Sequence, residues 1–222
     1  MDSFVDTNIP IAYVFSIDPH NKKSEFIFDN YDAIYWSKNV YDEFSLRCDE
    51  KLCNLIEFYE DFEYDLENWP KEVVRKKDMI KYLNGKNYED EKFYKDIKSS
   101  FDPILDRYVE SIDFVNVEVM LNGIHLFIDD LKANIYNKID NCEITCKCTP
   151  YRKNKYGSLY NALLKKPNVH ESDVIIVLDA HDYNLGLKEK IDFITFDKSF
   201  YNAVFQFREF SFNKILGIHD FF

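Results

Sequence analysis

The feature that most constrains the fold is an alternation of short apolar segments with helical patterns at both ends of the chain. Each apolar segment is short enough to be a buried strand, and the helical patterns are amphipathic. The strand patterns cover residues 1–5, 33–36, 189–196 and 210–216, and the helix patterns cover residues 9–13, 40–59 and 199–205. This alternation predicts an α/β fold with a central, mostly parallel sheet.

The middle of the chain has a different character. Residues 60–141 are highly charged, with apolar side chains at helical spacing and a break at Asn84-Gly85, so we expect several helices there. The chain has 222 residues, of which 46% are hydrophobic and only five are Gly and six Pro, so little of it suits a flexible linker. We therefore expect a single domain over residues 1–222 that carries a long helical insertion at about 60–141.

Charge and cysteine content exclude several classes of protein. The formal charge of −12 excludes a generally basic surface for nucleic acid, although a local basic stripe beside an acidic site is compatible with it. Five cysteines, an odd number, favour reduced thiols over disulfides. No apolar run is long enough to cross a bilayer, and the first residues do not resemble a signal peptide. We expect a cytoplasmic protein without a membrane partner.

Acidic residues follow the strand patterns. Asp6 comes directly after the first strand and Asp197 directly after the strand that ends at Phe196, while Glu43 lies at the start of the helix after the second strand. In parallel sheets the carboxyl ends of the strands form the ligand site. Asp173 joins these acids if its helix, which could equally be a buried strand over residues 174–178, begins at the same edge. Gathered carboxylates repel one another unless a cation compensates, and their oxygens select Mg²⁺ or Mn²⁺.

These residues resemble the motifs of the PIN domain family. The resemblance rests on Phe4-Val5-Asp6-Thr7-Asn8, on Glu43, on Asp173 in Ser-Asp-Val-Ile-Ile, and on Thr195-Phe196-Asp197-Lys198-Ser199-Phe200. It covers about the first 60 and the last 55 residues. The resemblance implies a three-layer α/β/α fold and a metal-dependent endoribonuclease that hydrolyses RNA, with single-stranded RNA as substrate and Mg²⁺ or Mn²⁺ as cofactor. It also implies a toxin, defence or RNA-processing role, an antitoxin or other protein partner, and a homodimer.

Each candidate residue has an expected role. Asp6, Asp173 and Asp197 are expected to bind the metal, and Glu43 is expected to bind a second ion or to orient the attacking water. Asn8, Thr195 and Ser199 are uncharged hydrogen-bonding residues suited to orienting these groups. Three of the acids also have a simpler interpretation: Asp6 could cap a helix, and Glu43 and Asp173 could be solvated carboxylates near helix N-termini.

One segment of the chain is basic. Residues 142–167 carry six cations against a single acid, Glu143, with tyrosines 151, 156 and 160 interleaved. Such a segment suits a rim that binds phosphates and stacks on bases, although it would also suit a solvated loop. The residues expected to contact substrate are Lys147, Arg152, Lys153 and Lys155.

Several alternatives remain open. An aspartyl phosphatase would require a second Asp where Asn8 stands, and a catalytically inactive PIN-like module would bind RNA or protein without cutting. Asp42, Asp179, Asp182 and Asp192 are expected to be surface charges, unless Asp179 or Asp192 replaces one of the four acids. His181-Asp182 is a weak metal-binding signal. Zinc could bind the cysteines 142, 146 and 148 together with Cys48, Cys53 or His170, but buried thiols suit this spacing better.

Overall fold

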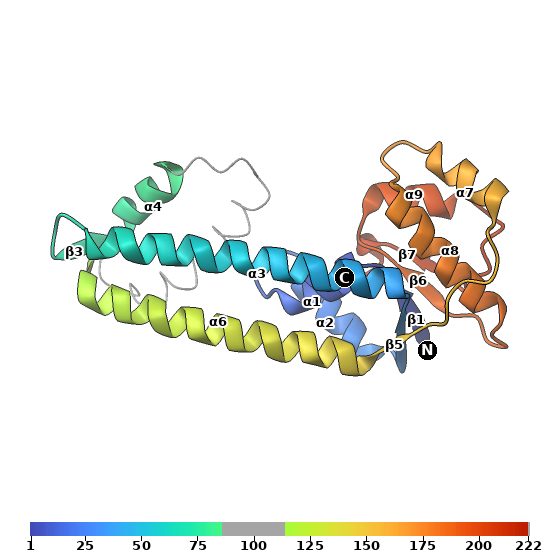
Figure 1. Cartoon of the computed structure of the whole chain (residues 1–222), viewed down its shortest axis with the longest axis horizontal. Helices are drawn as coiled ribbons and strands as arrows, with labels where there is room; N and C mark the ends of the chain where they lie inside the picture. The colour runs from blue at the N-terminus through green and yellow to red at the C-terminus, as the bar shows by residue number, and fades with distance from the viewer. Residues whose placement is uncertain (86–113, 222) are drawn as a thin grey trace. The chain divides into compact units, whose positions relative to one another are not determined.

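The chain divides into two compact units. The structure, a computed structural model, describes residues 1–85 and 114–221. The first unit comprises Met1–Cys48 and Asn137–Phe222, and the second comprises Asp49–Tyr136. The second unit is thus internal to the sequence of the first, and Figure 1 shows the elements of both. The expected single domain with an insertion at about 60–141 stays a prediction.

The first unit is built on a parallel sheet. Within the described residues the sheet has five strands in the order β5-β2-β1-β6-β7, and every neighbouring pair is parallel. The α/β class with a central parallel sheet is therefore confirmed. The strands are β1 (Asp2–Val5), β2 (Ala33–Trp36), β5 (Cys146–Cys148), β6 (Asp192–Ile194) and β7 (Ile215–Leu216).

One face of the sheet carries a row of aromatic side chains. Phe4 is paired in register with Tyr35 on β2 and with Phe193 on β6, so their side chains share this face. Helix α8 (Glu171–Leu185) covers the row through Tyr183, whose ring centroid lies 5.1 Å from that of Tyr35. Helix α9 (Lys198–Phe205) covers it through Phe200, 6.0 Å from Phe193. This packing holds the first turns of both helices at the carboxyl edge of the sheet.

Helices also cover the opposite face. Trp36, the neighbour of Tyr35, points to this face and packs against Phe44 of α3 (Lys38–Glu67), with ring centroids 5.4 Å apart. Helices α1 (Asn8–Val14) and α2 (Asn21–Asn30) pack on each other and lie on the side of the sheet away from α8 (Figure 1). The sheet is thus flanked by helices on both faces, as a three-layer α/β/α arrangement requires.

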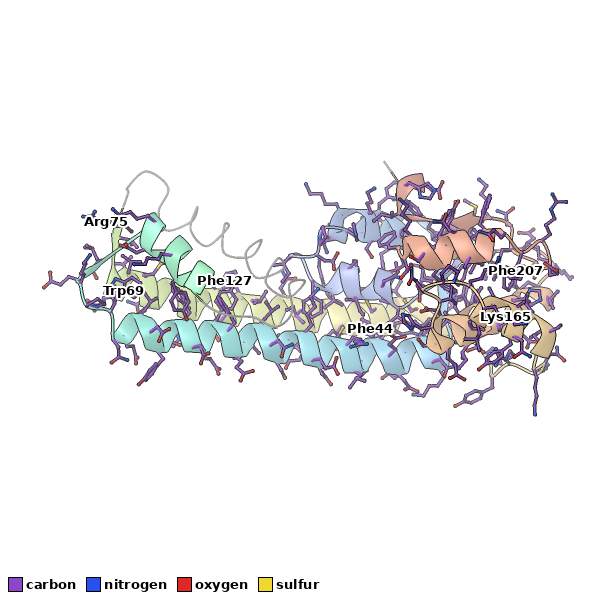
Figure 2. The ribbon with its side chains drawn as sticks, turned by 90° about the horizontal axis from the view of Figure 1, so that it is seen from above. Phe44, Trp69, Arg75, Phe127, Lys165 and Phe207 are labelled. Atoms are coloured by element: carbon purple, nitrogen blue, oxygen red, sulfur yellow. The ribbon has the colours of Figure 1, made fainter. Side chains whose placement is uncertain are left out.

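The second unit is mainly helical. It contains most of α3, all of α4 (Lys76–Gly85) and most of α6 (Val117–Thr145), and its core includes the ring contact of Tyr59 with Phe127, 5.1 Å between centroids. Figure 2 shows the side chains of Trp69 and Phe127 in this unit. Two short antiparallel strands, β3 (Val73–Arg75) and β4 (Phe114–Asn116), were not predicted. Their β-branched valines favour an extended backbone, which the helical spacing around them concealed.

Several segments of the first unit were left open, given other bounds or not predicted from the sequence. Of the helix and the buried strand that the sequence allowed for residues 174–178, the helix is confirmed as part of α8, because the capping residues before them start a helix. The last strand is shorter than residues 210–216, since Phe210 and Phe212 pack against His181 before pairing begins. Strand β5 and the helices α2 and α7 (Gly157–Leu164) were not predicted. A short 3₁₀ helix covers Ile218–Asp220.

The two longest helices, α3 and α6, are amphipathic. Among the helices of residues 1–85 and 114–221, none is both long enough and apolar enough to cross a membrane.

We expect Phe193→Ala to lower the free energy of unfolding of the first unit by about 3–5 kcal/mol, because Phe193 is fully buried in the sheet. Phe205→Ala is the matched control. Phe205 is 64% exposed, so its loss should cost less than about 1 kcal/mol. Urea unfolding followed by fluorescence in a Trp69→Phe background makes Trp36, which is buried in the first unit, the reporter. Equal losses for the two variants would contradict this assignment of the core.

Candidate functional site

The candidate site lies at the carboxyl edge of the sheet, where β1 has a neighbour on each side. Asp6 follows β1, and its backbone N–H donates to the carbonyl of Ile194, the last residue of β6, at 3.0 Å. This bond continues the parallel pairing by one residue and brings Asp6 beside Thr195. Residues that are 189 positions apart in the chain thereby become neighbours.

Asp6 is a buried carboxylate with three hydrogen-bond donors. It is 4% exposed. Its Oδ1 accepts from the backbone N–H of Thr7 at 2.7 Å, and its Oδ2 accepts from Asn8 Nδ2 at 2.8 Å and Thr195 Oγ1 at 2.7 Å. None of these donors is a cation, so the negative charge is hydrogen-bonded but not neutralised. The helix that follows begins at Asn8 with no side-chain cap, which argues against Asp6 as a simple capping residue.

The surroundings of Asp6 oppose its ionisation. Burial, together with the smaller effect of the charges of Asp173 and Glu43, raises the pKa of Asp6 to about 7, against the lowering effect of the hydrogen bonds from Thr195 and Thr7. An ordinary Asp would have a pKa of 3.8. Deprotonated Asp6 is therefore costly in the folded protein, and a nearby cation would relieve this cost.

Glu43 and Asp173 complete the electrostatic group with Asp197. Glu43, half-buried on α3, accepts a hydrogen bond from Thr7 Oγ1 at its Oε2, 3.0 Å away. Burial raises the pKa of Asp173, and the charges of Asp197 and Glu43 raise it further. The structure thus brings all four predicted acids into one neighbourhood, each within electrostatic range of at least one other.

Two of these acids also take part in helix caps. Asp197 is the N-cap of α9, and its Oδ1 accepts from the backbone N–H of Phe200 at 2.7 Å. In the first turn of α8, Asp173 Oδ2 accepts from the N–H of His170 at 2.9 Å. Each carboxylate uses one oxygen to stabilise a helix start. Capping therefore orients these side chains at the carboxyl edge and leaves the second oxygen of each for another role.

Uncharged residues form a tight network around Asp6. Asn8 Oδ1 accepts from the N–H of Phe196 at 3.0 Å, and Thr195 Oγ1 accepts from the N–H of Asp197 at 3.1 Å. Both side chains also donate to Asp6, so they fix the carboxylate against the loop after β6. Ser199 lies half-buried in the first turn of α9. Thr7, which binds both Asp6 and Glu43, was missed because its place in a strand-to-helix turn gave no separate signal.

The donor set suits a hard divalent cation in its chemistry. The four carboxylates and their neighbouring hydroxyl and amide groups offer oxygen ligands only, as Mg²⁺ and Mn²⁺ prefer. In the part of the chain that the structure describes, however, no three His, Cys, Asp or Glu side chains converge closely enough to hold one ion. The acids are thus electrostatic neighbours, two of which are turned towards helix N–H groups.

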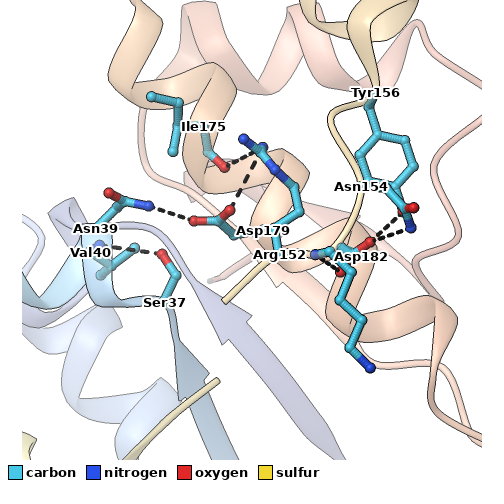
Figure 3. A network of polar contacts seen from close by, with 10 residues as sticks. Ser37, Asn39, Val40, Arg152, Asn154, Tyr156, Ile175, Asp179 and Asp182 are labelled. Atoms are coloured by element: carbon cyan, nitrogen blue, oxygen red, sulfur yellow. Dashed lines mark hydrogen bonds and ion pairs between the residues drawn. The ribbon is translucent and has the colours of Figure 1, made fainter. Parts of the chain in front are cut away.

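The predicted substrate-binding cations differ in their surroundings. Lys153 and Lys155 are exposed in the segment between β5 and α7. Lys147 is exposed on β5, with its Nζ 5.7 Å from the centroid of the Tyr35 ring. Arg152, by contrast, lies 3.6 Å from Asp179 Oδ1 and donates to the carbonyl of Ile175 at 3.5 Å (Figure 3). The segment is therefore held in place by Arg152 and presents its lysines to solvent.

The expectation of exposed charges is wrong for Asp179 and Asp192. Asp179 is 7% exposed and accepts from Asn39 Nδ2 at 2.7 Å, and burial raises its pKa. Asp192 is fully buried, where Asn213 Nδ2 donates to it at 2.8 Å. Asp192 starts β6, at the amino edge of the sheet, so it lies away from the acids that follow the strands. The sequence did contain a signal for this burial: Asp192 lies two residues before the apolar Ile194 on the same strand, so both side chains point to the same face of the sheet.

His181 and Asp182 have separate partners and do not form a metal-binding pair. His181 is buried against the rings of Tyr156 and Phe210, and burial lowers its pKa. Asp182 instead accepts hydrogen bonds from the segment after β5. Successive residues of a helix point about 100° apart, which explains the separation.

The cysteines that the sequence offered for zinc are mostly buried thiols. Cys48, Cys142 and Cys146 are at most 5% exposed, and burial raises the pKa of Cys146 to about 12. Burial also raises the pKa of Cys142. These two thiols are protonated at neutral pH, whereas zinc binds thiolates. Cys53 and Cys148 are exposed. This favours the interpretation of the cysteines as packing residues.

Comparisons with known proteins add no relationship: no family model, no curated protein and no solved structure matches this chain.

The raised pKa of Asp6 predicts how stability depends on pH. Folded Asp6 binds its proton more tightly than the unfolded chain does, so its contribution to stability is fully present below about pH 4 and is lost as the pH rises to about 7. The shift from 3.8 to about 7 corresponds to a loss of up to about 4 kcal/mol. Chemical unfolding in EDTA between pH 4 and 8 should show this decline, and Asp6→Asn should reduce it.

Asp42→Asn is the control for this measurement. Asp42 is an exposed acid on α3 that pairs with Lys38, and its loss makes the same change in net charge. Its decline with pH should match that of the unchanged protein. An identical decline in Asp6→Asn would show that Asp6 ionises normally in the folded protein.

Proposed function

We propose that this chain is a divalent-metal-dependent endoribonuclease with a PIN-like fold, acting through the acids at the carboxyl edge of its sheet. The observation that supports this most is Asp6: a buried carboxylate with a pKa raised to about 7, on which the charges of Asp173 and Glu43 act. A buried carboxylate that ionises without a nearby cation lowers the stability of the fold. A bound cation would offset its negative charge and remove this cost. Strongly shifted pKa values of this kind are common at functional sites.

The proposed roles follow from the contacts of each residue. Asp6, Asp173 and Asp197 would hold Mg²⁺ or Mn²⁺, and a bound ion of this kind acidifies water and stabilises negative charge on phosphate oxygens. Asn8 and Thr195 keep Asp6 in one orientation. To let Asp173 and Asp197 bind through both oxygens, their side chains would rotate away from the helix N–H groups that they now cap.

Glu43 is the proposed acceptor of the proton from the attacking water. Its Oε2 is bound by Thr7 Oγ1 at 3.0 Å, which fixes the carboxylate and leaves Oε1 to accept the proton. Half-burial keeps Glu43 within reach of solvent. Glu43 could alternatively bind a second ion, and both roles need its negative charge.

A second candidate function is a PIN-like module that binds RNA or protein without cutting. The observation that favours it is that no three of the described acidic, His or Cys side chains converge on one point. Unlike the nuclease, such a module would not bind a metal ion through these acids.

The proposal predicts Mg²⁺- or Mn²⁺-dependent cleavage of a fluorescent single-stranded RNA that EDTA abolishes. Asp6→Asn and Asp197→Asn should each lower the rate by about a hundred-fold or more, because each removes a charge that would hold the ion. Asn is as good an N-cap as Asp, so Asp197→Asn should leave α9 intact. Asp42→Asn is the charge-matched control and should cut normally. Cleavage that survives both substitutions, with circular dichroism unchanged, would refute the nuclease proposal.

Metal binding can be tested separately from cleavage. Millimolar Mn²⁺ at pH 8 should raise the thermal midpoint, because an ion that binds only the folded chain stabilises it by mass action. Thr195→Val removes a hydrogen bond to Asp6 but no charge, and it should weaken Mn²⁺ binding by about ten-fold or more. Scanning fluorimetry and calorimetry measure both effects. Absence of any binding would favour the non-cutting module.

A further inference from the structure

A basic loop is tied to the helix that carries Asp173. The loop covers residues 149–156, between β5 and α7, and two acids of α8 hold it, Asp179 and Asp182. Its first residue, Thr149, is fixed to the sheet, because its N–H donates to the carbonyl of Trp36 at 2.8 Å. The loop is thus anchored at its start to the carboxyl end of β2 and along its length to α8.

Asp182 makes the denser set of contacts. Its Oδ2 accepts from the backbone N–H of Lys153 at 2.9 Å, and its Oδ1 accepts from Asn154 Nδ2 at 2.9 Å and Tyr156 Oη at 2.6 Å (Figure 3). Burial opposes ionisation, but these hydrogen bonds prevail and lower the pKa of Asp182. The single ionised side chain of Asp182 thus holds residues 153–156 in place through three hydrogen bonds. The last of these residues, Tyr156, has a left-handed backbone conformation.

Asp179, one turn before Asp182, holds the other part of the loop. Its Oδ1 lies 3.6 Å from Arg152 Nη1, while its Oδ2 accepts from Asn39 Nδ2 at 2.7 Å. Figure 3 shows Arg152 between Asp179 and the carbonyl of Ile175. The arginine of the loop is thus used inside the protein, as a link between the loop and α8.

The side chains that the two anchors leave exposed are of the types that commonly contact polynucleotides. Tyr151 is 78% exposed, and Lys153 and Lys155 are exposed as well. Tyr156 and Tyr160, by contrast, donate to Asp182 and Glu171. An exposed ring offers a stacking face to an unpaired base, and exposed lysines attract phosphates. A loop already held in shape loses less entropy when it binds than a flexible one.

We propose that Asp182 is the positioning residue of this loop, holding Tyr151, Lys153 and Lys155 as a preformed contact surface for a single-stranded polynucleotide. The inference rests on the proposed function, since it concerns the substrate of the same site. Asp182 touches no substrate itself. It acts through the backbone of Lys153 and through the side chains of Asn154 and Tyr156.

The test measures binding without cleavage. Fluorescence anisotropy in EDTA follows a labelled 12-nucleotide oligouridylate, with the matching deoxyoligonucleotide and an RNA duplex as further probes. Asp182→Ala should raise the Kd for the single strands by about five- to ten-fold. Asp182→Asn, which keeps an oxygen acceptor for Asn154 and Tyr156, should recover most of the affinity. Glu189→Ala removes an exposed acid beyond α8 and should stay within about two-fold of the unchanged protein.

A second set of variants keeps the inference falsifiable if Asp182→Ala folds poorly. Tyr151→Ala, and Lys153→Ala with Lys155→Ala, should weaken single-strand binding while leaving the thermal midpoint within about 2 °C, because these side chains are exposed. Tyr151→Ala should spare duplex binding, since paired bases offer no free face. Equal affinity for the RNA and DNA single strands would place recognition in base and phosphate, and a preference for RNA would indicate contact with the 2′-hydroxyl.

The outcomes separate this inference from the proposed function. Metal-dependent cleavage in which Asp182→Ala raises KM and retains kcat supports both. Binding that depends on Asp182, without cleavage in any metal, supports the loop and refutes the nuclease. Unchanged binding in the folded Asp182→Ala variant or in the lysine double variant overturns the inference, and so does an unchanged protein that binds no polynucleotide.

Discussion

The parallel pairing of β1 with both β2 and β6 is the constraint on which the rest of the first unit depends. It places the carboxyl ends of three strands at one edge, so that the residues directly after them have no choice but to be neighbours. The bond from the Asp6 N–H to the Ile194 carbonyl extends this pairing to the first residue of the site. Helices α8 and α9 then bring their first turns to the same edge because Tyr183 and Phe200 pack on Tyr35 and Phe193 of the sheet.

The acidic side chains of the site lower the stability of the fold when they are ionised. Hydrogen bonds from uncharged donors satisfy the oxygens of Asp6 without neutralising it, and three more carboxylates lie nearby. Hydrophobic packing elsewhere in the unit keeps these groups together although their repulsion would separate them. The proposed metal ion explains this arrangement most simply, because one divalent charge would offset the repulsion that the fold sustains.

The same helix serves the acids and the basic loop. Helix α8 begins with Asp173 at the site, and its next turns carry Asp179 and Asp182, which hold the loop after β5. A region of positive charge is thus attached to a strongly acidic chain by acidic residues. Helix α8 therefore connects two parts of the proposed activity: the acids that would hold the ion and the loop surface that would bind the polynucleotide.

The sequence by itself determined the class of fold and the position of Asp6 and Asp197 directly after strands. Apolar strands followed by amphipathic helices are local patterns, and Asp6, Asp197, Asn8 and Thr195 could be placed at strand ends from those patterns alone. Only the tertiary structure showed which acidic residues are buried and that the loop after β5 is held by hydrogen bonds to α8. Asp192 and Asp179 were misjudged as exposed, because burial of a charge depends on partners such as Asn213 and Asn39 that are distant in sequence. Such long-range contacts leave no periodic signal in the chain.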